Sequence, residues 1–115
     1  MAKKILSQTD TITKLDIINS EASKSFRELV GADPVPVKGA ALIEDADKDG
    51  VITQFAYVFC NDGVVFGGNS ATVYRGVDGL IDLMGDDPDA KYAITVDERP
   101  TASGREFLSL CIVEL

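Results

Sequence analysis

The sequence predicts a β-rich α+β domain in which five strands curl into a partly open barrel, with a helix between the third and fourth strands and helices before the first. Three observations favour this class. In two stretches, apolar and polar residues alternate on both sides of a turn that contains glycine, as in a β-hairpin. One amphipathic helix separates the two stretches. Glycines also lie inside strands, at Gly39, Gly67 and Gly68, where glycine often marks a sharp bend or a close ligand approach.

The N-terminal region, residues 1–31, is predicted to be helical, and residues 35–115 to form the barrel, all within one domain of 115 residues. Apolar residues between 11 and 31 recur at helical spacing in two pieces. Ser25 and Glu28 are spaced as a capping box, and Gly31 follows as a stop. Two prolines then exclude helix, and the pattern changes to the alternation of a first strand.

The central hairpin, residues 54–70, holds four of the eight aromatic residues and leaves its register open. A two-residue turn would pair Phe59 with Phe66, whereas a three-residue turn that ends in a bulge at Gly63 would pair Val58 with Phe66. The choice decides which face of the strand is core.

A helix is predicted next, over residues 70–85, because its apolar residues fall on one helical face and Gly85 can end it. Gly76 and Gly79 weaken it by ~1 kcal/mol each relative to Ala. A second hairpin follows in residues 91–115, with its loop at 99–104. Five strands with a helix between the third and fourth is the order of the OB-fold, and an α+β sheet with helices on one face also fits.

Charge is unevenly distributed along the chain. The net charge is −8. Residues 1–43 hold six Lys and Arg against five acids, whereas residues 44–115 hold five against fourteen. This balance argues against a protein that grips duplex DNA with a broad basic surface. The acidic stretches 44–49 and 78–89 are expected to be solvated loops and a helix face.

Several classes of site are not expected. The chain has no His, Cys60 and Cys111 lie in apolar runs typical of free thiols, and we expect no metal and no cofactor. Residues 45–56 match the first half of a calcium loop, but Ala56 replaces the bidentate Glu, so a hairpin turn is favoured. We find no nucleophile beside a base and expect no enzymatic activity. No membrane span or signal peptide is expected, and we expect a cytoplasmic protein.

Four stretches of the chain are informative together: residues 25–31, 37–39, 61–70 and 103–107. Their layout resembles that of small phage-encoded single-stranded-DNA-binding proteins, including those of protein-primed phages, and the likeness covers residues 19–115. The resemblance implies an OB-like domain that coats exposed single strands during phage DNA replication without reading their sequence.

Binding of single strands needs aromatic platforms for the bases and cations for the backbone. The candidate residues for both are Arg99, Arg105, Phe55, Tyr57, Phe59, Lys38, Arg75 and Phe107. Arg99 and Arg105 flank a loop that contains glycine and form a candidate phosphate clamp. Phe55, Tyr57 and Phe59 share one strand face, which is either a stacking surface or packed core.

Two partner hypotheses remain beside single-stranded DNA. The N-terminal helices either pack on the barrel or mediate self-association. The alternative function is an acidic protein-binding module, a DNA mimic or host-protein inhibitor, that binds no nucleic acid; the net charge of −9 in residues 44–115 favours it.

Overall fold

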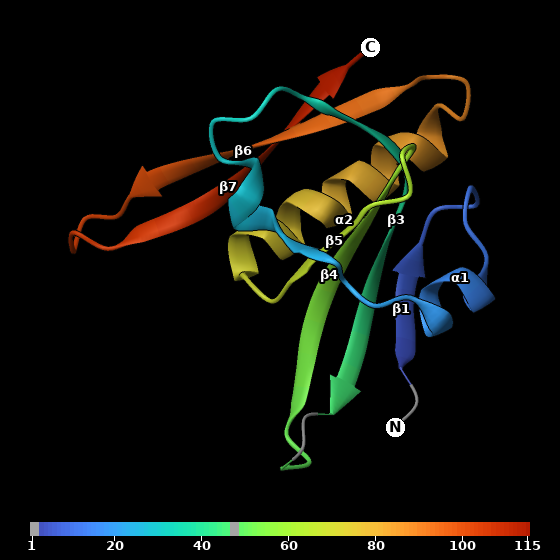
Figure 1. Cartoon of the computed structure of the whole chain (residues 1–115), viewed down its shortest axis with the longest axis horizontal. Helices are drawn as coiled ribbons and strands as arrows, with labels where there is room; N and C mark the ends of the chain where they lie inside the picture. Colours follow the sequence, from blue (N-terminus) through green and yellow to red (C-terminus); the bar gives the residue numbers. More distant parts are fainter. Residues whose placement is uncertain (1–2, 47–48) are drawn as a thin grey trace.

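The computed structural model describes residues 3–46 and 49–115, which form one mixed sheet with two α-helices and a 3-10 turn (Figure 1). In chain order the elements are β1 (Lys4–Gln8), α1 (Lys14–Asn19), β2 (Lys24–Ser25), η1 (Phe26–Leu29), β3 (Val35–Ala46), β4 (Ile52–Cys60), β5 (Val65–Gly68), α2 (Ala71–Asp86), β6 (Tyr92–Pro100) and β7 (Glu106–Glu114). The sheet order is β2-β5-β4-β3-β6-β7, and β1 pairs with β3 off this path. The five predicted strands and the helix between the third and fourth are therefore present.

The sheet curls because β3 is shared between its two halves. Val35 and Pro36 pair with β6, whereas β3 pairs with β4 from Val37 onward. The register shifts between Val37 and Gly39, and such a bulge bends a strand and increases its twist. Since β5 and β7 are not paired with each other within the described residues, the sheet is an open half-barrel, and α2 packs against strands of both halves (Figure 1).

The main core lies between α2 and the even-numbered face of β4. Ala56, Val58 and Cys60 of β4 are buried in one cluster with the apolar stripe of α2. That stripe consists of Val73, Val77, Leu80 and Ile81, at the helical spacing expected from the sequence. Burial of these side chains outweighs the poor helix propensity of the glycines in α2.

The central hairpin adopts the three-residue turn. Val58 is opposite Phe66, and the Cys60 N–H donates to the Val64 carbonyl at 2.9 Å. Gly63 has a φ of 90°, a left-handed conformation that favours glycine. The odd-numbered face of β4 therefore points away from α2.

The prediction of a helical N-terminal region is wrong. The segment begins with the strand β1, α1 has only six residues, and the second predicted helix is the 3-10 turn η1. Leu15 and Ile18, two of the apolar residues that recur at helical spacing between residues 11 and 31, are 68% and 48% exposed. The free edge of β3 offers backbone hydrogen bonds to β1, and a helix as short as α1 gains little from its own propensity.

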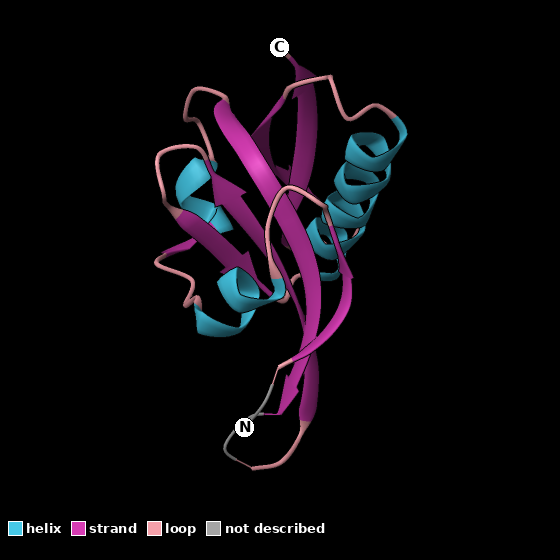
Figure 2. Cartoon of the chain, turned by 90° about the vertical axis from the view of Figure 1, so that its right-hand side faces the viewer, coloured by secondary structure: helices cyan, strands magenta, loops and turns pink. Residues whose placement is uncertain are grey.

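This N-terminal segment covers part of the odd-numbered face, opposite α2 (Figure 2). Ile12 and Ile17 form a second buried cluster with Ile43 and Phe59. A Cβ on Gly67 would lie 2.5 Å from the Cβ of Ala22, so the glycine admits this segment. A Cβ on Gly39 would likewise meet Thr9 and Thr11 at 2.7 Å. The close approach expected at these glycines is made by the chain itself.

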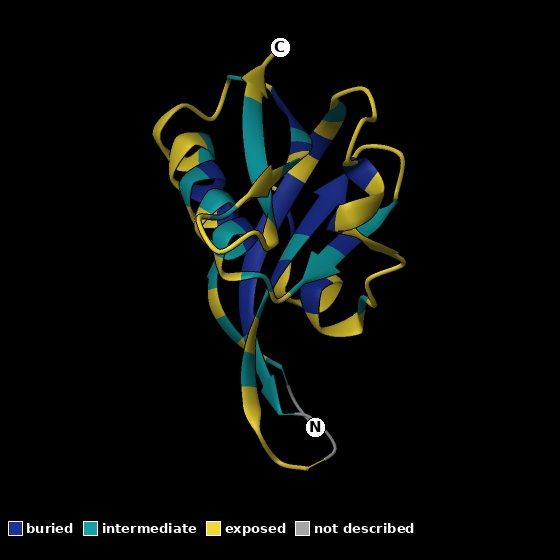
Figure 3. Ribbon diagram, turned by 90° about the vertical axis from the view of Figure 1, so that its left-hand side faces the viewer, coloured by how far each residue is buried: buried dark blue, intermediate teal, exposed yellow. Residues whose placement is uncertain are grey.

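Residues 49–52 and 102–106, in the two long hairpins, are exposed, whereas the centre of the sheet is buried (Figure 3). The stretch with partial calcium-loop character lies at the end of the β3–β4 hairpin, and its Asp47 and Lys48 lie outside the described residues. Cys60 and Cys111 are free thiols. In the described part of the chain, no helix is both long and apolar enough to span a bilayer.

Candidate nucleic-acid interface

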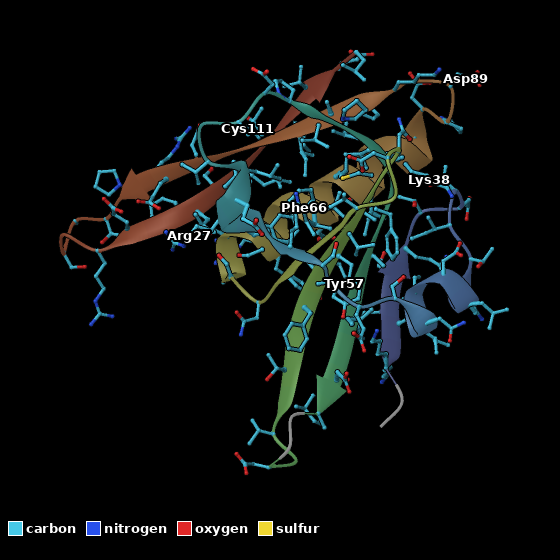
Figure 4. The ribbon with its side chains drawn as sticks, in the orientation of Figure 1. Arg27, Lys38, Tyr57, Phe66, Asp89 and Cys111 are labelled. Carbon is cyan, nitrogen blue, oxygen red and sulfur yellow. The ribbon has the colours of Figure 1, made fainter. Side chains whose placement is uncertain are left out.

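Tyr57 is the centre of the candidate interface, on the odd-numbered face of β4 (Figure 4). Its side chain is half-buried and opposes Gly67 across the β4–β5 pair. A Cβ on Gly67 would lie 3.0 Å from the Tyr57 ring, so the absence of a side chain there leaves room for the ring. The ring of Phe59 meets Tyr57 edge-on, with centroids 6.3 Å apart and planes at 68°. These contacts hold the Tyr57 ring in a defined orientation on this face.

A cation is held over the same ring. Lys3 Nζ lies 5.1 Å from the Tyr57 centroid, within the range of a cation–π contact. The ammonium also donates to the carbonyls of Ile17 and Ser20 at the end of α1. A positive charge is favourable beside the last carbonyls of a helix, so α1 positions Lys3 at the aromatic ring.

The three aromatics predicted on this strand face divide by burial. Phe59 is 7% exposed and belongs to the second buried cluster, so its faces are not available for base stacking in this conformation. Phe55 and Tyr57 are half-buried at the margin of that cluster. The candidate stacking surface therefore contains Phe55 and Tyr57 but not Phe59.

Arg99 and Arg105 lie at the end of the β6–β7 hairpin, and both are exposed. The loop between them is closed by two hydrogen bonds: the Thr101 N–H donates to the Arg105 carbonyl at 2.6 Å, and the Arg105 N–H donates to Thr101 Oγ1 at 3.1 Å. Arg99 Nη2 lies 3.7 Å from Asp97 Oδ2, an exposed pair of the kind that contributes little to stability. Both guanidinium groups are accessible to a phosphate.

The remaining candidates do not join this surface. Lys38 is exposed at the bulge of β3, and Figure 4 shows it on the opposite side of the molecule from Arg27. Arg75 is exposed on α2, and Phe107 is half-buried on β7 beside a groove of about 360 Å³ between β5 and β7. The structure therefore distributes the predicted residues over several regions.

Two further cations lie on β2 and η1, in the segment that follows α1. Lys24 is exposed on β2, which pairs with β5. Arg27 Nη1 is 2.5 Å from Glu98 Oε2 and ties η1 to β6. The sequence did not lead us to predict these cations as candidate binding residues, namely Lys3, Lys24 and Arg27. The positive net charge of residues 1–43 could have indicated them.

Besides Glu44, Asp45 and Asp49 at the end of the β3–β4 hairpin, carboxylates of the described residues gather at two places. One is the exposed side of α2 and the turn after it, with Asp78, Asp82, Asp86, Asp87 and Asp89. Because α2 covers the even-numbered face of β4, this helix lies on the other side of the sheet from Tyr57. The second place is near Arg27, where hydrogen bonding to Glu98 and its negative charge raise the pKa of Glu106.

The described residues contain no group of three or more His, Cys, Asp or Glu side chains arranged to hold a metal ion. Comparisons with protein-family models, with curated proteins and with solved structures found no match to this chain.

Proposed function

We propose that this protein binds single-stranded DNA without reading its sequence, on the face of β4 and β5 that points away from α2. The observation that carries the proposal is the half-buried ring of Tyr57 with the Lys3 ammonium 5.1 Å from its centroid. An aromatic face accepts any base, and a neighbouring cation attracts the phosphate backbone. The pair supplies both requirements at one point.

The order of the elements supports the same surface. With β3 taken as the first strand of an OB-like barrel, β4 and β5 are the second and third, and the β3–β4 and β6–β7 loops are the two that flank the ligand face in OB-folds. Phe55 and Tyr57 lie on that face, and Arg99 and Arg105 lie at one of those loops.

The charge distribution also supports this face. A net charge of −8 repels nucleic acid unless cations are segregated from acids. The acidic side of α2 lies across the sheet from Tyr57, whereas Lys3 is on the Tyr57 side. Arg27, paired with Glu98, adds a cation beside β6. A bound phosphate would compete with Glu98 for Arg27.

The proposal extends to the setting that the resemblance implies, the coating of single strands during the replication of phage or mobile-element DNA. That setting requires no catalytic group and no sequence readout.

The test is a fluorescence anisotropy titration of labelled oligo-dT with wild type, Tyr57→Phe and Tyr57→Ser. Stacking contributes ~1–3 kcal/mol per base, so Tyr57→Ser should weaken binding by roughly 5- to 150-fold, while Tyr57→Phe keeps the π-face and should bind like wild type. In Arg99→Ala/Arg105→Ala, the slope of log affinity against log salt concentration should become shallower by the amount expected for the loss of about two phosphate contacts.

Circular dichroism and urea unfolding of each variant serve as the folding control. No binding of oligo-dT at low ionic strength would refute the proposal. Equal affinity for duplex DNA would refute base stacking on Tyr57, and so would equal losses in the Phe and Ser variants.

A second function is favoured by the acidic side of α2. Its five aspartates between Asp78 and Asp89 form a surface suited to a basic protein, in the manner of a DNA mimic or host-protein inhibitor. This function predicts salt-sensitive binding of a polylysine peptide that is lost in Asp78→Asn/Asp82→Asn, with no binding of oligo-dT. The two titrations together separate the two functions.

A further inference from the structure

The strand β4 has an open edge beyond the end of its neighbour. β5 pairs with β4 only over the stretch from Ala56 to Phe59. Residues 52–54 pair with β3 on one side, and no other strand among the described residues pairs with them on the side of β5. An unpaired strand edge is a template for the addition of another strand.

The backbone groups at this edge follow from the hydrogen-bond pattern of the hairpin. The Cys60 N–H donates to the Val64 carbonyl, so the even-numbered residues of β4 turn their N–H and C=O groups toward β5. By the same alternation, Ile52 and Gln54 turn theirs toward the open edge. These two residues are exposed, Ile52 to 64%. Four backbone groups therefore face solvent in the spacing of a strand ladder.

A groove of about 680 Å³ lies along this edge. Ile52 and Gln54 form part of one wall, and Asn69, Tyr74 and Arg75, at the start of α2, form part of the other. Its size is within the ~300–1,000 Å³ of typical ligand sites. A groove between a strand edge and a helix accommodates one extended chain, as in domains that bind peptides by strand addition.

The side chains of the groove restrict the chemistry of the occupant. Ile52 offers apolar surface, and the half-buried Tyr74 offers an aromatic side chain. Arg75 is exposed on the α2 wall, and its guanidinium makes no ion pair with any described residue. Glu44 also lines the groove, and its carboxylate would repel phosphate. An acidic side chain on the occupant would have to face Arg75.

We propose that this groove binds an extended segment of a partner protein, which adds to β4 as an antiparallel strand at Ile52 and Gln54 and directs an acidic side chain to Arg75. A peptide supplies the alternating N–H and C=O groups that the edge requires, whereas a nucleic-acid backbone does not. The site is on the α2 side of the sheet and is independent of the surface around Tyr57.

The experiment starts from selection of random octapeptides displayed on phage against the full chain. We expect the selected peptides to alternate apolar residues and to contain an acidic residue. A selected peptide is then titrated into ¹⁵N-labelled protein, and the exchange of amide protons with solvent is measured with and without it. The amides of Ile52 and Gln54 should exchange at least about tenfold more slowly in the complex, because both become hydrogen-bonded.

Variants locate the contacts. Arg75→Glu should weaken the peptide by about tenfold or more, and the matched control Lys91→Glu, another exposed cation, should leave its affinity within about twofold. Gln54→Pro removes one N–H that faces the groove without removing a bond to β3, and should also weaken the peptide. Circular dichroism checks the fold of each variant, and Arg75→Glu keeps the test valid if the proline variant fails to fold.

Three results would overturn the proposal: a selection that returns no binding peptide, a peptide whose amide footprint lies away from Ile52 and Gln54, or an affinity unchanged in Arg75→Glu. Displacement of the peptide by oligo-dT would also overturn it, since that result would assign the groove to nucleic acid. Because the Tyr57 variants leave this groove intact, they test single-strand binding separately.

Discussion

Gly76 and Gly79 lie three residues apart in α2, and we expect their substitution by alanine to have opposite effects on stability. A Cβ on Gly76 would lie 2.7 Å from the Cβ of Leu110 and 3.1 Å from its Cδ2, because α2 packs closely on β7 there. A Cβ on Gly79 would meet nothing within 4 Å. The two sites therefore share the gain in helix propensity and differ in steric cost.

The magnitudes follow from these two effects. Replacing Gly by Ala inside a helix stabilises it by ~1 kcal/mol, so Gly79→Ala should raise the free energy of unfolding by roughly 0.5–1 kcal/mol. At Gly76 the same gain is opposed by overpacking against Leu110, which costs roughly 1–3 kcal/mol. The propensity gain cancels between the variants, and Gly79→Ala should be more stable than Gly76→Ala by about 1–3 kcal/mol.

The assay is urea unfolding followed by circular dichroism, with thermal unfolding as a second measurement. A difference of 1 kcal/mol corresponds to a shift in Tm of about 4 °C for a domain of this size. Equal slopes of the unfolding free energy against urea concentration would show that both variants expose the same amount of surface on unfolding. If Gly76→Ala is as stable as Gly79→Ala, the close packing of α2 on β7 is refuted.

Four further predictions concern buried or conformationally restricted groups. Thr9→Val removes the Oγ1 that accepts the Ala40 N–H at 3.1 Å, and should lower the free energy of unfolding by ~1–3 kcal/mol in urea melts; an unchanged value would contradict this. Gly63→Ala forces a side chain into a φ of 90° and should destabilise by ~1 kcal/mol in the same assay. Burial raises the pKa of Cys60 from 9.0 to about 11, so the free energy of unfolding should fall as pH rises through that window, where the unfolded thiol ionises first. Only Cys111, which is half-buried, should react quickly with a thiol reagent in the folded protein; rapid modification of both thiols would contradict the burial of Cys60.

Local pattern was sufficient for most of the elements. The helix expected at residues 70–85 is α2, and the two hairpins were identified from their alternation and turn residues. These signals are local because a strand repeats every two residues, a helix every 3.6, and glycine permits positive φ in a turn. The apolar spacing before Gly31 misled because Ile12 packs on a sheet formed later in the chain, whereas Leu15 and Ile18 of the same spacing are exposed.

The candidate site could be predicted only as a set of residue types. The sequence shows that Phe55, Tyr57 and Phe59 share a face, but burial of Phe59 under Ile12 and Ile17 is a contact between segments about forty residues apart. Lys3 is also distant in sequence from Tyr57, and its position depends on the end of α1. No local pattern carries such information.

The sequence by itself determined the strand and helix elements from residue 35 onward, because each is encoded by the periodicity of neighbouring residues. Only the tertiary structure decided which alternatives were realised: the register that pairs Val58 with Phe66, and the β1 strand on the edge of β3. It also distinguished Gly76 from Gly79, which look alike in sequence. The physical reason is the same in each case, since packing and strand pairing depend on which distant segments meet.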